Sequence, residues 1–145
     1  PKDGHFTAHL NTKFLRTFDQ MKTNLDTNRE LIVDGRPAGR FSGKVAEPRP
    51  GLACGHIPGS VNLMPTLFVN TETGALLSKS ELRNVFVKAG IDPEDPMAMT
   101  CGSGVAAAAL SFVRFLVTGK IAPVYDGSWT EWGSIKGAPV ATSQS

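Results

Sequence analysis

Residues 97–106 have the sequence MAMTCGSGVA, in which a short apolar run leads into one cysteine and then into a glycine-rich loop. The run at 97–100 is typical of a buried strand, and residues 105–117 favour a helix, so the loop joins a strand to a helix. Glycines allow such a loop to turn its N–H groups inward, and the helix adds the positive end of its dipole. Both effects stabilise a thiolate, so Cys101 is predicted to be a nucleophile. Cys101 taken alone also fits a buried, inert cysteine.

Strand and helix patterns alternate along the rest of the chain. Short apolar runs predict three further strands, at residues 31–33, 61–63 and 122–125. This alternation favours an α/β fold with a mainly parallel central sheet that is covered by helices on both faces. Ligands of such sheets bind at the carboxyl ends of the strands, where Asp34 and Cys101 lie.

Two more helices are expected from local signals. Apolar residues recur at helical spacing between positions 14 and 25, which predicts a helix from residue 11 with Asn11 or Thr12 as its N-cap. The sequence SKSE at 78–81 is a capping box and predicts a helix at 79–89, which ends at a glycine.

The chain of 145 residues is long enough for one domain with a core of its own. We expect an arm or linker at 1–10, a catalytic domain at 11–135 and a flexible C-terminal tail at 136–145. The segment 36–58 is rich in glycine and proline, and loops of that length in compact domains are usually functional.

Composition limits the classes of function. The two cysteines lack metal-binding spacing and are too few for a disulfide scaffold, which favours a reducing compartment and predicts no metal site. A net charge of +2, with dispersed basic residues, gives no argument for nucleic acid. Nothing in the sequence predicts a membrane span. An intracellular protein, cytoplasmic or mitochondrial, is therefore expected.

Four segments together resemble one family. They are VDGRPAGRF at 33–41, GHIPGSVN at 55–62, CGSGV at 101–105 and VYDGSWTEW at 124–132, and they occur in the order of the rhodanese (sulfurtransferase) family. Within that family the chain looks most like the catalytic C-terminal half of the enzymes that use 3-mercaptopyruvate. The resemblance implies a rhodanese-like three-layer α/β/α fold.

The same resemblance implies the chemistry of Cys101. Its thiolate would attack the sulfur of 3-mercaptopyruvate, release pyruvate and keep a persulfide, which passes to a thiol such as thioredoxin or to another nucleophilic acceptor. Ser103 would direct its hydroxyl toward the substrate and help to move a proton, and no cofactor is required. Glycine is expected to be needed at positions 102 and 104. The backbone N–H groups that would stabilise the persulfide belong to Gly102, Ser103, Gly104, Val105 and Ala106.

Arginines of the long loop are the expected substrate clamp. Arg40 and Arg49 match substrate-binding positions of the mercaptopyruvate enzymes, and a guanidinium holds a carboxylate with two parallel hydrogen bonds. Arg36 is expected to pair with a neighbouring carboxylate and to brace the loop, and Asp34 is expected in such an ion pair. His56 is interpreted as structural, as are the aromatic and acidic residues that follow position 124.

Three loop positions bear on the choice of substrate and on the rate. Relatives that use thiosulfate carry Arg and Lys directly after the cysteine, whereas this chain has Gly102 and Ser103, which favours 3-mercaptopyruvate. Ala106 stands where the family usually has Thr, so slower chemistry is expected.

Other functions remain open from the sequence. A cysteine phosphatase is disfavoured because no arginine closes the loop after Cys101. A thiosulfate sulfurtransferase, a sulfur carrier and a rhodanese-like interaction module remain as alternatives. Relatives with two halves place the site between them, so a rhodanese-like N-terminal domain of the same polypeptide is an expected partner, and the chain alone would be incompletely active.

Overall fold

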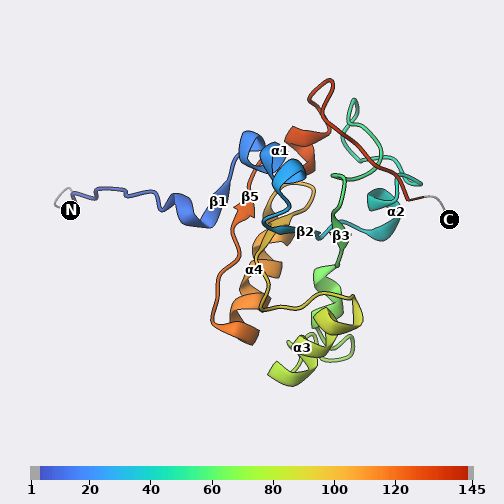
Figure 1. The fold of residues 1–145 in the computed structure, drawn as a ribbon. Coiled ribbons are helices and arrows are strands. Elements are labelled where there is room, and N and C mark those ends of the chain that lie inside the picture. The colour runs from blue at the N-terminus through green and yellow to red at the C-terminus, as the bar shows by residue number, and fades with distance from the viewer. Residues whose placement is uncertain (1–3, 144–145) are drawn as a thin grey trace.

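A five-stranded parallel sheet forms the centre of the protein, in a computed structural model that describes residues 4–143 (Figure 1). The strand order is β1-β5-β4-β2-β3, so the expected mainly parallel sheet is confirmed. The bounds are β1 Leu15–Arg16, β2 Leu31–Asp34, β3 Val61–Asn62, β4 Met97–Thr100 and β5 Val124–Tyr125. Because Asp34 pairs with Thr100 in register, the two central strands end side by side and deliver Gly35 and Cys101 to the same edge.

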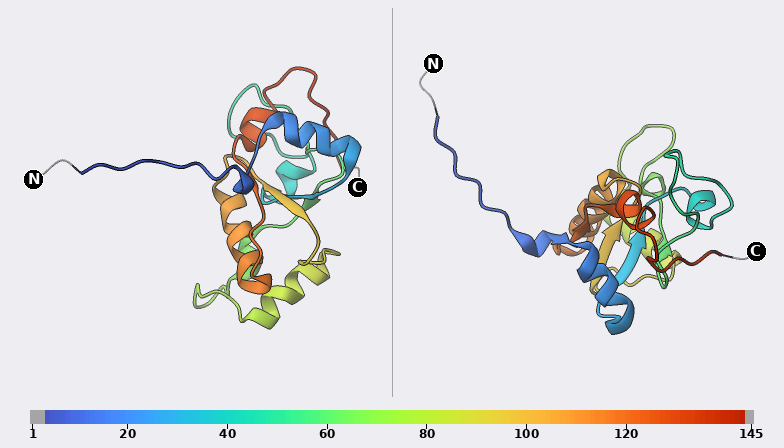
Figure 2. Two further views of the ribbon diagram at one scale, coloured as in Figure 1. Left: turned by 60° about the vertical axis from the view of Figure 1, so that its left-hand side comes forward. Right: turned by 90° about the horizontal axis from the view of Figure 1, so that it is seen from above.

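Side chains alternate between the two faces of the sheet and build a core on each. Val33 and Met99 pack under helices α3 (Lys79–Lys88) and α4 (Val105–Thr118). Ile32 and Ala98 pack on the other face, against residues of α1 (Phe18–Thr27) and α5 (Ser128–Trp132). Figure 2 shows that α1 and α4 lie on different sides of the sheet. The three-layer α/β/α arrangement is therefore confirmed, with each face of the sheet buried as a parallel sheet requires.

The N-terminal helix is shorter than expected. The expectation of a helix from residue 11 is wrong, because the chain first forms a 3-10 helix, η1 (Thr12–Phe14), and then edge strand β1, paired with β5. Helix α1 begins only at Phe18. Its cap is Thr17, whose hydroxyl accepts from the N–H of Gln20 while the Gln20 side chain accepts from the N–H of Thr17. Of the two residues expected to cap the long helix, Asn11 caps η1 instead, and Thr12 is the first residue of η1.

The other expected helices are confirmed, and short elements complete the connections. Helix α3 starts at its predicted capping box, and α4 follows the cysteine loop. The long loop contains one turn of helix, α2 (Ala38–Phe41), and a 3-10 helix, η2 (Pro65–Phe68), follows β3. No helix within residues 4–143 has the length and apolar character needed to cross a membrane.

The chain ends differ from each other in the part that the structure describes. Residues 4–10 form an extended, exposed arm that leads away from β1 (Figures 1 and 2). The expected C-terminal tail lies against the domain at Ala141, which exchanges two backbone hydrogen bonds with His56. Residues 1–3 of the arm and 144–145 of the tail lie outside the described residues.

Candidate active site

Cys101 is the first residue after β4 and is held by backbone contacts on two sides. Its Sγ accepts a hydrogen bond from the N–H of Gly104 at 3.1 Å, and the residue is 2% exposed. Its own N–H donates to the hydroxyl of Ser128 at 3.2 Å, and its carbonyl accepts from the N–H of Trp129 at 2.9 Å. Helix α5 therefore fixes the backbone of Cys101, and the loop places a donor on its sulfur.

The glycines of the loop have different requirements. Gly104 has φ +86°, and an added Cβ would lie 3.2 Å from the carbonyl oxygen and from Oδ1 of Asp126. Only glycine adopts that backbone angle easily. Gly102 has no such angle, and an added Cβ would have no neighbour within 4 Å. The expectation that Gly102 must be glycine for steric reasons is therefore wrong, whereas the same expectation for Gly104 is confirmed.

A hollow of about 340 Å³ opens beside the thiol. Its lining includes Cys101, Ser103 and Ala106 from the loop and α4, and Arg36 and Arg40 from the long loop. The side chain of Arg40 is about one third exposed, and its Nη1 lies 3.8 Å from Oε2 of Glu47. The structure thus brings one arginine of the expected clamp, the nucleophile and the loop serine to the same hollow.

Arg49 reaches the loop by a different route. It is exposed, and its Nη1 donates to the hydroxyl of Thr130 at 2.7 Å. Thr130 in turn donates to the carbonyl oxygen of Gly102 twice, from its hydroxyl at 2.6 Å and from its N–H at 3.0 Å. Arg49 is therefore tied to the residue that follows the nucleophile.

Arg36 forms the expected brace under the hollow. Its Nε and Nη2 donate to the carboxylate of Asp34 at 2.8 to 3.2 Å, and its Nη1 donates to Glu47 at 2.8 Å. The guanidinium also donates to the carbonyl of Gly55 and lies 4.1 Å from the centre of the Trp129 ring. Only 2% of the Arg36 side chain is exposed, so the pair is buried and the start of the long loop is anchored to β2.

The other polar residues that the sequence singled out have structural positions. The Nδ1 of His56 lies 2.8 Å from the carbonyl oxygen of Phe41, which can only accept, and its ring stacks on the Phe41 ring at 3.9 Å. Burial raises the pKa of Tyr125, and its hydroxyl donates to Glu131 at 2.6 Å, which raises that pKa further. The structural interpretation of these residues is confirmed, and Cys54 is an exposed free thiol.

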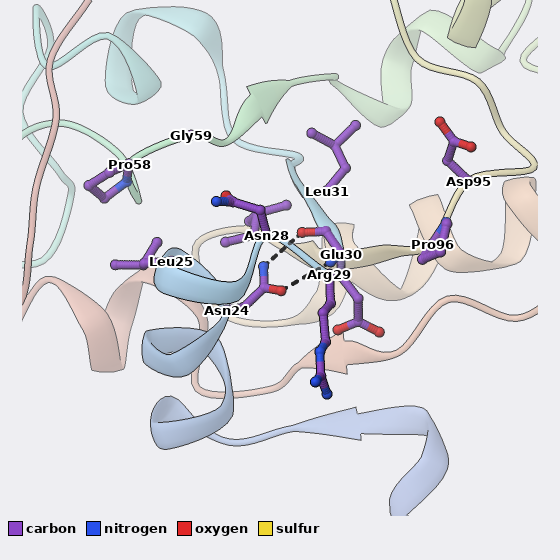
Figure 3. A pocket seen from close by; sticks show the side chains of 11 residues that line it. Asn24, Leu25, Asn28, Arg29, Glu30, Leu31, Pro58, Gly59, Asp95 and Pro96 are labelled. Atoms are coloured by element: carbon purple, nitrogen blue, oxygen red, sulfur yellow. Dashed lines mark hydrogen bonds between the residues drawn. The ribbon is translucent and has the colours of Figure 1, made fainter.

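A second hollow, of about 280 Å³, lies at the opposite edge of the sheet, where β2 and β4 begin (Figure 3). Arg29 and Pro96 are among its lining residues. The amide of Asn24 donates to the carbonyl of Glu30 and accepts from its N–H, so this buried polar group is already satisfied within the chain. Among the residues lining this hollow there is no cysteine, and within residues 4–143 no cluster of His, Cys, Asp and Glu fits a metal ion.

Sequence reasoning missed Ser128 and Thr130, which hold the nucleophile loop. Both lie in VYDGSWTEW, which was interpreted as packing and turn residues. Ser128 has φ +50°, and its side chain is buried beside Cys101. A serine and a threonine that follow a strand end and a DG turn, at the same sheet edge as the cysteine, are the only local signal for this role.

Comparisons with known proteins give a consistent result. The profile of the Rhodanese-like domain family matches residues 17–135. The 3-mercaptopyruvate sulfurtransferase of Homo sapiens is 41% identical over 91% of the chain, and the thiosulfate sulfurtransferase of Gallus gallus is 39% identical over 91%. The crystal structure of the Tum1 protein from Saccharomyces cerevisiae superposes with a TM-score of 0.77 at 27% identity over 90% of the chain. The matched regions are 44%, 45% and 47% of these three proteins, so the chain spans about half their length.

Proposed function

The chain belongs to the rhodanese-like domain family, and we propose that it transfers sulfur from 3-mercaptopyruvate, through a persulfide on Cys101, to a thiol acceptor. The observation that carries this proposal is the hollow whose lining contains both the free cysteine Cys101 and Arg40. A nucleophilic sulfur and a carboxylate-binding group in one hollow fit a small substrate that has both a thiol and a carboxylate.

The proposed reaction forms one S–S bond and breaks one C–S bond. The Cys101 thiolate attacks the thiol sulfur of 3-mercaptopyruvate, and the electrons of the C–S bond leave with the three-carbon fragment as the enolate of pyruvate. A proton then converts the enolate to pyruvate. In the second step a thiolate acceptor attacks the outer sulfur, takes it as a new persulfide and returns Cys101 to its thiolate form.

The residues around the hollow support each part of this reaction. The N–H of Gly104 already donates to Sγ, so it stabilises the negative charge on that sulfur. The remaining N–H groups of 102–106 would serve the outer sulfur. Ser103 is exposed and lines the hollow, where its hydroxyl would relay the proton to the enolate. Arg40, together with Arg49, would hold the substrate carboxylate.

Thiosulfate is the second candidate donor, because relatives of both names match the chain equally widely. Thiosulfate carries two negative charges and no carboxylate. The loop offers it no cation, since residues 102–106 are GSGVA, and the arginines that line the hollow come from the long loop instead. This distribution of charge supports 3-mercaptopyruvate as the preferred donor.

Arg40→Ala tests the substrate. We expect kcat/KM for 3-mercaptopyruvate to fall by about 10- to 100-fold, because a charge-assisted pair contributes about 1.5–3 kcal/mol. Pyruvate release in the presence of dithiothreitol is the measurement. Arg29→Ala is the matched control, since Arg29 is exposed at the opposite edge of the sheet and its loss should leave the rate unchanged. A wild-type chain that turns over thiosulfate faster than 3-mercaptopyruvate would contradict the proposal.

A second rhodanese-like half is the proposed partner, and the outer face of α4 is the surface that it would cover. Helices α1 and α3 expose charged residues, such as Lys22 on α1 and Lys88 on α3, whereas every exposed residue of α4 is apolar. An exposed helix face that is made only of apolar residues marks a surface that another protein segment covers. The relatives are about twice as long as this chain, so they contain a further half that can bury such a face. The exposed residues of α4 are Val105, Ala108, Ala109, Phe112 and Phe115.

The position of this face connects the partner with the chemistry. Val105 is 78% exposed and also lines the hollow beside Cys101, so a domain seated on α4 would close the hollow on its open side. Water would then be excluded from the transfer, which strengthens every electrostatic contact inside.

The partner is tested by adding the N-terminal half of the human relative, as a separate protein, to this chain. We expect pyruvate release to rise several-fold, and Phe112→Glu to remove the gain because a buried carboxylate is costly. Val87→Glu is the control, since Val87 is an exposed apolar residue on α3. A chain that sediments as a dimer, and becomes monomeric with Phe112→Glu, would show instead that a second copy covers the face.

A further inference from the structure

Thr130 joins two parts of the site that lie far apart in the sequence. It is the third residue of α5, and it contacts Gly102 on one side and Arg49, 81 positions away, on the other. The hydroxyl and the N–H of Thr130 both donate to the Gly102 carbonyl oxygen. Arg49 bonds to Thr130 and not to Gly102, and Gly102 bonds to Thr130. Thr130 therefore links the expected clamp to the cysteine loop.

The direction of this hydrogen-bond chain is fixed by chemistry. A guanidinium can only donate, and a carbonyl oxygen can only accept. The one proton of the Thr130 hydroxyl must therefore point to Gly102, and its lone pair faces Arg49. A chain that starts at a cation and runs in one direction is strengthened at each step. The hydroxyl at position 130 is therefore held in one orientation.

The link has a consequence for the loop donors. The peptide group is planar and trans, so the N–H of Ser103 points opposite to the carbonyl of Gly102. Because Thr130 draws that carbonyl toward α5 with two hydrogen bonds, the N–H of Ser103 is directed away from α5. Ser103 lines the hollow, and its N–H is one of the loop donors that the proposed function assigns to the outer sulfur of a persulfide.

The link also has a consequence for Arg49. The side chain is exposed and would otherwise sample many rotamers. One of its five N–H groups is used on Thr130, and the others remain available for a carboxylate. Arg49 is thus oriented beside the loop before a substrate arrives, which lowers the entropy cost of binding.

We propose that Thr130 is a positioning residue that orients both Arg49 and the Gly102–Ser103 peptide group. The same hydroxyl then positions the group that binds the carboxylate and a group that stabilises the transferred sulfur. The proposal rests on the proposed function for its substrate, and on the three hydrogen bonds of Thr130 for its geometry. It assigns to α5 a role in substrate binding beyond the packing of its tryptophans.

Thr130→Val is the test, because valine keeps the shape and the backbone N–H but removes the hydroxyl. We expect kcat/KM for 3-mercaptopyruvate to fall about tenfold, mostly through KM, and Thr130→Ser to restore it. In the double variant of Thr130→Val with Arg49→Ala, the two losses of kcat/KM should not multiply, since both substitutions break the same series of hydrogen bonds. Multiplied losses, or a Thr130→Val enzyme with wild-type KM, would overturn the proposal.

A second measurement does not depend on turnover. Iodoacetate and iodoacetamide both alkylate a thiolate with loss of iodide, but only iodoacetate carries a carboxylate. In a Cys54→Ser background, Cys101 should favour iodoacetate over iodoacetamide relative to free cysteine. Thr130→Val should lower this preference to that of Arg49→Ala, and Thr130→Ser should retain it. An unchanged preference in Thr130→Val would overturn the link.

The two measurements separate the failure of this inference from the failure of the proposed function. A wild-type chain that releases no pyruvate, alone or with the added N-terminal half, would contradict the proposed substrate. The alkylation preference would still decide whether Thr130 orients Arg49. Thr71→Val is the control for a general effect of the substitution, because Thr71 is an exposed residue in the turn before α3.

Discussion

Cys101→Ser is expected to abolish persulfide formation and to lower pyruvate release by about four orders of magnitude or more, the scale seen when a catalytic nucleophile is removed. A serine oxygen at this position would still receive the N–H of Gly104, but its hydroxyl is not ionised near neutral pH and does not form a persulfide. The measurement is the mass of the intact protein after incubation with 3-mercaptopyruvate, in which one added sulfur atom reports the persulfide.

Cys54→Ser provides the matched control for this result. Both cysteines are free thiols, but Cys54 is exposed in the long loop, whereas Cys101 is buried and receives a backbone hydrogen bond. We expect the Cys54 variant to gain the sulfur atom and to release pyruvate at the wild-type rate. If the Cys101 variant still gains the sulfur, and the Cys54 variant does not, then the nucleophile has been misassigned.

The strand, loop and helix around Cys101 could be predicted because their signals are local. Residues 97–100 form a short, mostly apolar run, the glycine-rich loop follows Cys101, and a helix-forming run begins at 105. The structure confirms the strand at 97–100 and the start of the helix at 105. The start of α1 could not be predicted in the same way. The apolar spacing across 14–25 fits a helix, but Leu15 and Arg16 gain backbone partners in β5, more than 100 positions later. The pairing of β1 with β5 therefore outweighs the helical spacing of the apolar residues at this point in the chain.

The candidate site shows the same division between local and long-range contacts. The ion pair of Arg36 with Asp34 joins neighbours in the sequence and was expected. The role of Thr130 depends on contacts 28 and 81 positions away, and no spacing rule predicts them. The difference between Gly102 and Gly104 is also invisible in the sequence, because it depends on where Asp126 lies.

The buried ion pair beneath the hollow gives the largest expected effect on stability. Asp34 is fully buried, and its carboxylate accepts from Nε, Nη2 and the backbone N–H of Arg36. Asp34→Ala leaves the Arg36 guanidinium buried with Glu47 as its remaining carboxylate. Removing one partner of a buried pair costs about 3–5 kcal/mol, because the other charge stays away from water. The free energy of unfolding in urea is the measurement.

Glu30→Gln sets the scale for this prediction. Glu30 pairs with Arg16, and about a fifth of each side chain is exposed, so water reaches this pair but not the pair of Asp34 and Arg36, and its loss should cost less, about 1 kcal/mol. The Asp34 variant should also lose activity, since Arg36 anchors the loop that carries Arg40 to the hollow, and Glu47 of that loop contacts both arginines. A loss of stability no greater than that of Glu30→Gln would show that the guanidinium reaches water or a new acceptor once Asp34 is removed. The difference in the free energy of unfolding between these two variants therefore measures how much the buried carboxylate of Asp34 contributes to holding Arg36 in place.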